Sequence, residues 1–275
     1  MFGSVPDINN SMGPFVVTTS HRPTPEQVAL AYELAEELST TFIPRNDKSV
    51  QDLLISAGCT GLLVVSATRI SFLSGSSEFF FHPSLAGLRI KEINDGKNDQ
   101  MIQAMSLGPG DSLLDCTLGL GTDAIVASYV AGDGGRVTGL ESSSVIATIV
   151  RRGLKSYQTM EEDLTEAMQR IEVVKTNHKE YLASLPPQSY DVVYFDPMFR
   201  VPRRNSPSID ALRRIANTDP VDLETIDLAL QVCKRRVVMK ERRWSEEFSR
   251  LGFTEFYGGK YAPVIYGVIE QVGLR

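Results

Sequence analysis

From residue 112 to the C-terminus, short apolar segments alternate with longer helical segments, and this alternation constrains the fold more than any other feature. The segments that we expect to be strands are 112–116, 136–141, 171–175, 190–195, 235–240, 253–257 and 264–270. Strands that are joined by helices pair in parallel, whereas the last two flank Gly258 and Gly259 and should form an antiparallel pair. The sequence therefore predicts an α/β fold with one mostly parallel, seven-stranded sheet.

The N-terminal part of the chain has a different pattern, which begins with two short helices. Thr24 suits a helix cap, Pro25 suits the first helical position, and Gln27 stands at the third position of a capping box. A second helix is expected to begin near Ser49 and to stop by Gly58.

Strand-like segments follow these helices and complete a small unit. Segments 62–65 and 69–73 should form a hairpin, and 78–83 a further strand. We therefore expect a disordered tail over residues 1–14, a small α+β unit over 15–95 and a larger α/β domain over 96–275.

The composition agrees with a cytoplasmic enzyme. The chain has 275 residues, of which 42% are hydrophobic, so it can bury a full core. Cys59, Cys116 and Cys233 are far apart and odd in number, which favours reduced thiols over disulfides. The sequence contains no cluster that predicts a metal site, no apolar run long enough to cross a bilayer, and no signal sequence at its N-terminus.

A candidate substrate site follows the strand at residues 190–195. Asp196 can accept hydrogen bonds, and the carbonyl of Pro197 can accept a second bond from the same amino group. Phe199 can stack on a flat ring. Because ligands bind at the carboxyl edge of open α/β sheets, these residues predict a planar substrate with an amino group. An ordinary Asp-Pro turn after a strand is the structural alternative.

A second motif, at residues 113–124, predicts a strand, a glycine turn and the start of a helix. Gly119 and Gly121 allow the backbone to approach a ligand closely. Twenty residues after Gly121, a second strand ends at Glu141, where a carboxylate can bind ribose hydroxyls.

The glycine turn fits two cofactors. Gly119, Gly121 and Ala124, with the distant Glu141, match a dinucleotide fingerprint, so an NAD-dependent oxidoreductase is one interpretation. However, Asp115 precedes the turn and Asp123 follows it, and both carboxylates would repel a pyrophosphate. A ligand with a ribose and a cationic portion suits the turn better, which describes S-adenosylmethionine (SAM).

Four segments together resemble a known family. In chain order they are LLDCTLGLGTDA, GLESSSVIATIVRRGLKSY, VVYFDPMFR and RRVVMKER, and the match runs from about Leu113 to Lys240. They are similar to segments of the ribosomal small subunit methyltransferase J family and its uncharacterised relatives, which are class I SAM-dependent methyltransferases. The resemblance implies a Rossmann-like seven-stranded class I methyltransferase sheet with a small N-terminal α+β unit. It also implies methyl transfer to an exocyclic amino group of an RNA base, by resemblance guanine N2 in 16S rRNA.

The resemblance also assigns roles to residues. The implied cofactor-binding residues are Asp115, Gly119, Gly121, Thr122, Asp123, Glu141, Ser142, Asn177, His178 and Asp196. Thr122 and Asp123 would lie against the methionine end of SAM with the glycine turn, Ser142 would join Glu141 at the ribose, and Asn177 and His178 would lie on the adenine side. A surface or capping role for His178 is the alternative.

Catalysis and RNA contacts are assigned to the Asp-Pro motif that follows residues 190–195 and to the residues after it. Asp196, Pro197 and Phe199 would be catalytic, with Asp196 and Pro197 orienting the amino group and Phe199 stacking on the base. The implied substrate-binding residues are Phe199, Arg200, Arg203, Arg204 and Lys240.

The charge distribution supports RNA as the partner. The span 200–243 holds eleven basic and six acidic residues, a net charge of +5, so the rest of a chain of net charge −6 carries −11. A basic surface beside the substrate motif suits phosphate contacts, although a solvated face would look the same. A catalytically silent RNA-binding module with this fold is a further alternative.

Overall fold

The computed structural model describes residues 13–197 and 220–271. These residues form two compact units, which divide between Phe81 and His82. The sequence had placed the division at residue 96. The structure differs because helix α3 (Ser84–Asn94) packs against two helices of the larger unit, α5 (Thr122–Ala131) and α7 (Glu162–Arg170).

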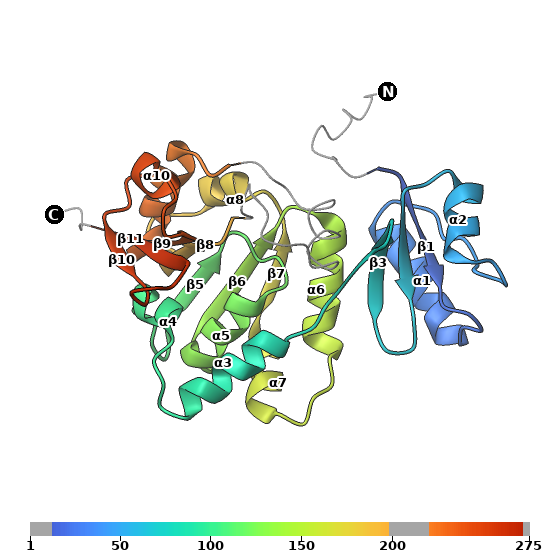
Figure 1. Ribbon diagram of the computed structural model, residues 1–275, viewed down its shortest axis with the longest axis horizontal. Helices are drawn as coiled ribbons and strands as arrows, with labels where there is room; N and C mark the ends of the chain where they lie inside the picture. The colour runs from blue at the N-terminus through green and yellow to red at the C-terminus, as the bar shows by residue number, and fades with distance from the viewer. Residues whose placement is uncertain (1–12, 198–219, 272–275) are drawn as a thin grey trace. The chain divides into compact units, whose positions relative to one another are not determined.

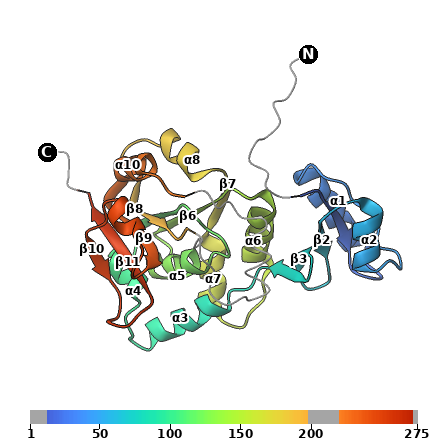
Figure 2. The ribbon, with the colours of Figure 1, turned by 45° about the horizontal axis from the view of Figure 1, so that its top comes forward.

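The N-terminal unit is a four-stranded sheet with one helix on each face (Figure 2). Its elements are β1 (Phe15–Thr19), α1 (Pro25–Glu37), α2 (Val50–Ala57), β2 (Gly61–Val65), β3 (Ile70–Ser74) and β4 (Ser77–Phe80). β1 and β2 are parallel, and β2, β3 and β4 follow as antiparallel neighbours. On the other side of β1, Val17 forms a parallel bridge with Phe42.

The ends of both helices in this unit are fixed by the residues that the sequence indicated. Thr24 and Ser49 each form a capping box with the residue three positions later. Gly58 ends α2 in the left-handed conformation, with φ of 61°, which favours glycine. The predicted capping box of α1, and the predicted start and end of α2, are therefore confirmed.

The larger unit contains the predicted seven-stranded sheet (Figure 1). Its strands are β5 (Ser112–Asp115), β6 (Arg136–Glu141), β7 (Glu172–Lys175), β8 (Tyr190–Phe195), β9 (Cys233–Arg242), β10 (Glu255–Tyr257) and β11 (Val264–Glu270). Along the sheet their order is β10, β11, β9, β8, β5, β6, β7. β7, β6, β5, β8 and β9 are parallel, and β11 and β10 complete the sheet as antiparallel strands.

The sheet confirms the predicted fold class, and all seven expected strands lie within two residues of their predicted bounds. The helices of this unit besides α3, α5 and α7 are α4 (Gln100–Met105), α6 (Ser144–Ser156), α8 (His178–Ser184), α10 (Leu223–Val232) and α11 (Glu247–Arg250).

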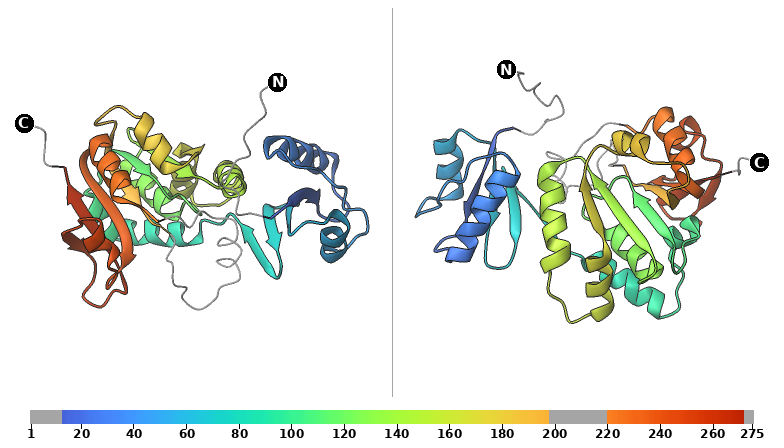
Figure 3. Two further views of the ribbon diagram at one scale, coloured as in Figure 1. Left: turned by 90° about the horizontal axis from the view of Figure 1, so that it is seen from above. Right: turned by 180° about the vertical axis from the view of Figure 1, so that it is seen from behind.

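The middle strands of this sheet are buried because helices cover both faces. In the view from above, α8 and α10 lie across the sheet from α3 (Figure 3). Val192, Val193, Tyr194 and Phe195 of β8 are all 0% exposed. A continuous apolar run is typical of a parallel strand that is covered on both faces. In the part of the chain that the structure describes, no helix has the length and apolar character needed to cross a membrane.

Candidate functional site

The candidate site lies at the carboxyl edge of the parallel strands. β5 is the first strand of this sheet in the chain, and its two neighbours are β6 and β8, so the strand order changes direction at β5. This is the place where open α/β sheets bind ligands. Four ionisable side chains lie at or beside these strand ends. Asp115 and Glu141 end β5 and β6, Asp196 follows β8, and Lys240 stands two residues before the end of β9.

The glycine turn after β5 leaves room for a ligand beside its backbone. Gly119 has a φ of 51° and Gly121 a φ of 75°, so both adopt the left-handed conformation that favours glycine. A β-carbon on Gly119 would meet a single atom within 4 Å, the carbonyl oxygen of Thr117 at 3.9 Å. Thr122 follows as the first residue of α5. The turn therefore presents its main chain to open space at Gly119.

Glu141 ends β6 beside this turn, and its carboxylate is directed by main-chain amides. The side chain accepts a hydrogen bond from the Ser143 amide at 2.8 Å, and the amides of Gly119 and Ser142 also donate to it. Burial outweighs these bonds and raises the pKa of Glu141 to about 7. A buried carboxyl with this raised pKa needs further hydrogen-bond donors, and a pair of ribose hydroxyls would supply them.

Asp115 ends β5 and is almost completely buried, with 1% of its surface exposed. Its carboxylate accepts a hydrogen bond from the Thr117 amide at 3.0 Å. Burial, with the negative charges of Asp123 and Asp196, raises the pKa of Asp115 to about 8. Because a cation would offset these causes, this position suits a positively charged ligand group.

Lys240 joins two carboxylates at the centre of the site. Its Nζ donates to Oδ2 of Asp196 at 2.7 Å and to Oδ2 of Asp123 at 2.9 Å. Burial opposes the charge of Lys240, but the two carboxylates raise its pKa above the usual value. The lysine is therefore held as an ammonium ion between the start of α5 and the end of β8.

Asp123 is held by the protein's own donors on several sides. Besides Lys240, it accepts from the Tyr194 hydroxyl at 2.8 Å and from Nη1 of Arg89 at 2.5 Å. Burial would raise the pKa of Asp123, but Lys240 and Arg89 lower it below the usual range. Arg89 is itself fixed by two bonds to Asp99, at 2.8 and 2.9 Å. This structural role for Asp123 was not predicted, and its contact with the cofactor stays a prediction.

Asp196 is fixed in position through its main chain, and its side chain is accessible to a ligand. Its amide donates to Oγ1 of Thr117 at 2.6 Å, which ties the end of β8 to the glycine turn. Burial raises the pKa of Asp196 to about 6, although Lys240 opposes this. The side chain keeps 29% of its surface accessible, and Pro197 follows it directly. A ligand can therefore reach the carboxyl group, which is mostly ionised at neutral pH.

Asn177 and His178 lie where β7 gives way to α8. Asn177 caps the helix, because its Oδ1 accepts from the Lys179 amide at 2.8 Å. The His178 ring packs edge-on against Phe195, with centroids 5.9 Å apart. The strand order brings both residues to the same edge as Glu141. Their proposed contact with adenine stays a prediction.

Some predicted residues lie outside the described residues, and some residues of the site were missed. Phe199, Arg200, Arg203 and Arg204, together with Met198, fall in the first group. Thr117, Tyr194 and Arg89 were missed as site residues. Tyr194 had a usable signal, because it precedes Asp196 by two residues on a strand and so faces the same side.

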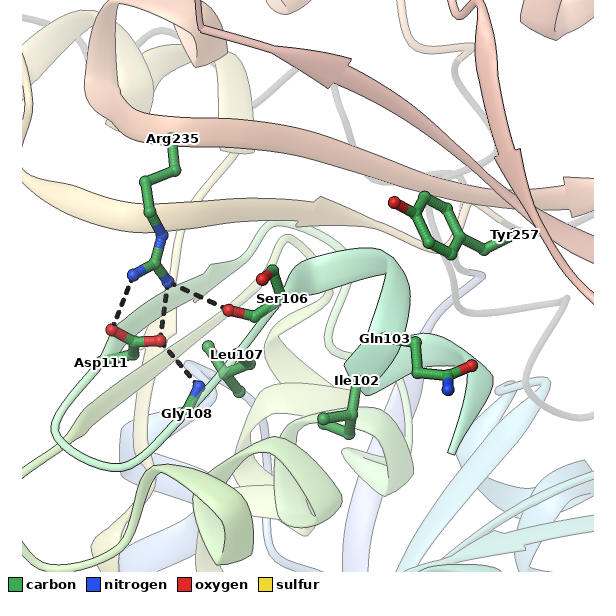
Figure 4. Close-up of a pocket in the computed structure, with 8 residues that line it drawn as sticks. All are labelled: Ile102, Gln103, Ser106, Leu107, Gly108, Asp111, Arg235 and Tyr257. Carbon is green, nitrogen blue, oxygen red and sulfur yellow. Dashed lines mark hydrogen bonds and ion pairs between the residues drawn. The ribbon is translucent and has the colours of Figure 1, made fainter. Parts of the chain in front are cut away.

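Part of the basic span 200–243 does not lie at the site. Lys234, Arg235 and Arg236 begin β9 at the amino edge of the sheet, where each pairs with an acid. Arg235 borders an open hollow of about 720 Å³ there, together with Asp111 and Tyr257 (Figure 4). In that hollow Arg235 bonds to Asp111 at 2.6 and 2.9 Å. We place the site at the carboxyl edge because the carboxyls whose pKa values are raised by burial lie there.

The carboxyl edge fits the parts of SAM. Asp115 is a buried carboxyl suited to the ammonium group, and Glu141 is suited to the ribose. The open space at Gly119 allows close approach of the ligand to the main chain between them. The described residues therefore offer acceptors suited to two groups of this cofactor.

Comparison with known proteins identifies the family of the chain. Residues 80–251 match a family model described as "Putative SAM-dependent methyltransferase". The chain is 40% identical to the uncharacterized protein YpiP of Bacillus subtilis, over 93% of this chain and 99% of that one. It is 27% identical to a protein of Coxiella burnetii named ribosomal RNA small subunit methyltransferase J, over 86% of this chain and 91% of that one.

A solved structure shares the fold. It is a SAM-dependent methyltransferase from Neisseria gonorrhoeae, with a TM-score of 0.64 and 17% identity, and the match covers 94% of this chain and 97% of that one.

Proposed function

Because the chain belongs to the family of SAM-dependent methyltransferases, we propose that it methylates an exocyclic amino group of an RNA base. SAM is the cofactor of this family, so the interpretation of the glycine turn as a dinucleotide site is wrong. The finer proposal concerns the acceptor, which we take to be N2 of a guanine in 16S rRNA.

Two observations support RNA as the substrate. Curated relatives from several bacteria carry the name ribosomal RNA small subunit methyltransferase J, and one of them aligns over 86% of this chain. The four sequence segments that resemble that family include the Asp-Pro motif at the end of β8. The choice of guanine N2 rests on this resemblance.

The observation that carries the proposed chemistry is the position of Asp196. Its carboxylate lies at the switch point of the sheet, is partly accessible, and is followed by a proline whose carbonyl is a second acceptor. An exocyclic amino group donates two hydrogen bonds and therefore matches two neighbouring acceptors. Lys240 fixes one carboxylate oxygen, so the orientation of the group is set before the base arrives.

The chain's own residues then account for the reaction. Bound SAM would supply an electrophilic methyl group, whose bond to the sulfonium sulfur would break as the new bond to nitrogen forms. The amino nitrogen is a poor nucleophile because its lone pair is delocalised into the ring. Acceptors at Asp196 and Pro197 would favour a pyramidal nitrogen and stabilise the positive charge that develops on it. As the nitrogen–methyl bond forms, the nitrogen loses a proton, and the accessible Asp196 carboxylate can accept it and pass it to water.

The reaction also depends on alignment and on access to the base. Two bound substrates in line would contribute much of the rate. A guanine in a helix must leave its stack to reach Asp196, unless it is already single-stranded. Phe199 remains the proposed stacking partner, and Arg200, Arg203 and Arg204 the proposed phosphate contacts.

The test combines two experiments. Purified protein with SAM carrying a labelled methyl group should transfer the label to small-subunit rRNA. Nucleoside analysis of rRNA from cells with and without the gene should show one missing N2-methylguanosine. SAM binding with transfer to another acceptor would overturn the RNA proposal, and RNA binding without transfer would select the silent RNA-binding alternative. Loss of a different modified base would overturn guanine N2 alone.

A further inference from the structure

The N-terminal unit contains a buried cation that has no anionic partner. Arg45 is 9% exposed, although Pro44, Asn46, Asp47 and Lys48 around it are all exposed. The side chain therefore folds back into the unit while its own loop lies at the surface. Buried arginines are normally paired with a carboxylate, because an isolated charge is costly to remove from water.

The contacts of Arg45 do not compensate its charge. Its Nε donates to the Lys48 carbonyl at 2.8 Å, and its Nη2 lies 3.4 Å from Nε2 of His21. Within residues 13–197 and 220–271, no ion pair joins Arg45 to an acid. Asp52, on the same side of the unit, accepts instead from Ser49. The guanidinium carries five N–H donors, so it has capacity for an anion in addition to these two partners.

The His21 contact leaves a further donor available. A guanidinium can only donate, so Nε2 of His21 must accept this bond, and the ring proton is then on Nδ1. His21 is exposed, as is Lys48, whose ammonium forms a bond with Ser56 at 3.3 Å. The loops after β1 and after Phe42 thus bring a guanidinium, an imidazole N–H and an ammonium to one side of the unit.

The fold adds positive potential near His21 and Arg45. The Lys48 ammonium lies farther along α2, beside Ser56 in its last turn. β1 and the segment at Phe42 run in parallel, so the loops that follow them leave the sheet at the same edge. These loops lead into α1 and α2, whose N-terminal ends carry the positive end of the helix dipole. Thr24 and Ser49 already cap one amide of each helix, so the side chains of His21, Arg45 and Lys48 have to supply the direct contacts.

We propose that His21, Arg45 and Lys48 form a phosphate-binding site that takes a backbone phosphate of the RNA substrate. A phosphate accepts several charge-assisted hydrogen bonds at once, which suits a guanidinium beside two other donors. The phosphate chemistry follows from the residues alone, whereas RNA as its source rests on the proposed function. The N-terminal unit would then be an RNA-binding part of the enzyme.

The first experiment tests the phosphate site without RNA. The chain has only three histidines, so the imidazole signals of the full-length protein can be assigned by nuclear magnetic resonance with His21→Gln as reference. Titration with inorganic phosphate should shift the His21 signals and leave those of His82 and His178 unchanged. Absence of a His21 shift up to high millimolar phosphate would overturn the site.

The second experiment tests the source of the phosphate. We expect His21→Gln and Lys48→Gln, both exposed, to lower affinity for a small-subunit rRNA fragment and to leave SAM affinity unchanged. Loss of one phosphate contact should reduce the slope of log affinity against log salt by about 0.7 to 0.9. Arg69→Gln is the matched control in the same unit, because Glu78 already pairs with Arg69 at 3.0 Å.

The outcomes separate this inference from the proposed function. If both variants bind RNA with wild-type affinity and slope while phosphate still shifts His21, the site takes free phosphate and the RNA assignment is wrong. If wild-type protein binds SAM but no RNA, the proposed function fails, and the phosphate titration still decides the site. An equal loss of RNA affinity in Arg69→Gln would mean that the loss comes from the lower positive charge of the unit. It would overturn His21, Arg45 and Lys48 as a site for an RNA phosphate.

Discussion

The amino edge and the carboxyl edge of the seven-stranded sheet both carry acidic side chains, but these acids have different partners at the two edges. At the amino edge, Asp111 pairs with Arg235, and Asp191 pairs with Lys234. Ser112 also donates to Asp191, from its amide at 2.8 Å and from its hydroxyl at 2.5 Å. Partial burial opposes ionisation there, but the bonds from Ser112 and Lys234 lower the pKa of Asp191. Asp111 and Asp191 thus each have a cation already.

At the carboxyl edge, carboxyls outnumber the cations that reach them. Lys240 and Arg89 bond to Asp123, and Lys240 also bonds to Asp196. Asp115 accepts from a main-chain amide, and Glu141 from main-chain amides and the Ser142 side chain, but among the described residues neither forms an ion pair with a cation. Burial raises their pKa values to about 8 and about 7. Carboxyls that fold into such positions weaken the protein and are typical of functional sites. The comparison indicates that the amino edge stabilises the fold and the carboxyl edge binds the ligands.

The sharpest test of this comparison replaces, in two separate variants, the aspartates at the two ends of the same strand, β8. Asp196→Ala removes the acceptor at the carboxyl edge, and we expect methyl transfer to fall by about 100-fold or more with SAM binding retained. Asp191→Asn, at the amino end, should cost about 1 kcal/mol of stability and leave transfer unchanged. Turnover with labelled SAM, together with urea unfolding, checks both. Equal activity in the two variants would mean that the edges do not differ as proposed.

A second pair of variants compares two lysines of β9. Lys240→Met leaves Asp123 and Asp196 without their shared ammonium, and we expect a loss of about 2 to 4 kcal/mol in the free energy of unfolding at pH 8. Lys234→Met should cost less than about 1 kcal/mol, because that side chain is 45% exposed.

The pH dependence of this loss separates the two lysines further. Without Lys240 the pKa of Asp196 rises further above that of the unfolded chain, whereas Arg89 still bonds to Asp123, so the variant loses stability as pH rises. The difference from the wild type should therefore shrink between pH 8 and pH 5. A difference that is independent of pH would mean that Lys240 acts through packing alone.

The third prediction concerns the proton on Asp115. With a pKa of about 8, the carboxyl is largely protonated at pH 7 before SAM binds. Binding of a cationic ammonium beside it should ionise it and release close to one proton. SAM affinity should then rise by up to about tenfold per pH unit below pH 8. Calorimetry in two buffers with different ionisation enthalpies measures the released proton.

The control for this prediction comes from the amino edge. Asp115→Asn should remove most of the proton release, whereas Asp111→Asn, which pairs with Arg235, should leave it unchanged. If Asp115→Asn released the same number of protons, Glu141 would be the group that ionises and the ammonium would lie elsewhere.

The strands could be predicted from the sequence because each depends on local patterns. An apolar run bounded by turn residues marks β8, and the capping box at Thr24 marks the start of α1. The domain division was harder to predict. α3 follows the N-terminal unit directly in the chain, and only its packing against α5 and α7 assigns it to the larger one.

A site residue could be predicted only where a single sequence motif both contains the residue and fixes its place in the fold. Asp115, Glu141 and Asp196 end their strands and were therefore placed at the correct edge. The bond from Arg89 to Asp123 joins residues 34 positions apart and depends on how α3 crosses α5, which no motif indicates. The basic span was misleading for the same reason, because β9 carries its charges to both edges of the sheet.

The smallest expected effect concerns Arg235, which borders the hollow at the amino edge (Figure 4). Arg235→Gln breaks two bonds to Asp111, but the arginine is 41% exposed, so the cost should be below about 1 kcal/mol and should diminish at 0.5 M salt. Urea unfolding at two salt concentrations measures this. SAM affinity and methyl transfer should not change, because Arg235 and Asp111 lie at the opposite end of the strands from Asp115 and Asp196. A fall in either would show that the amino edge also binds a ligand, and the division between a stabilising edge and a binding edge would be wrong.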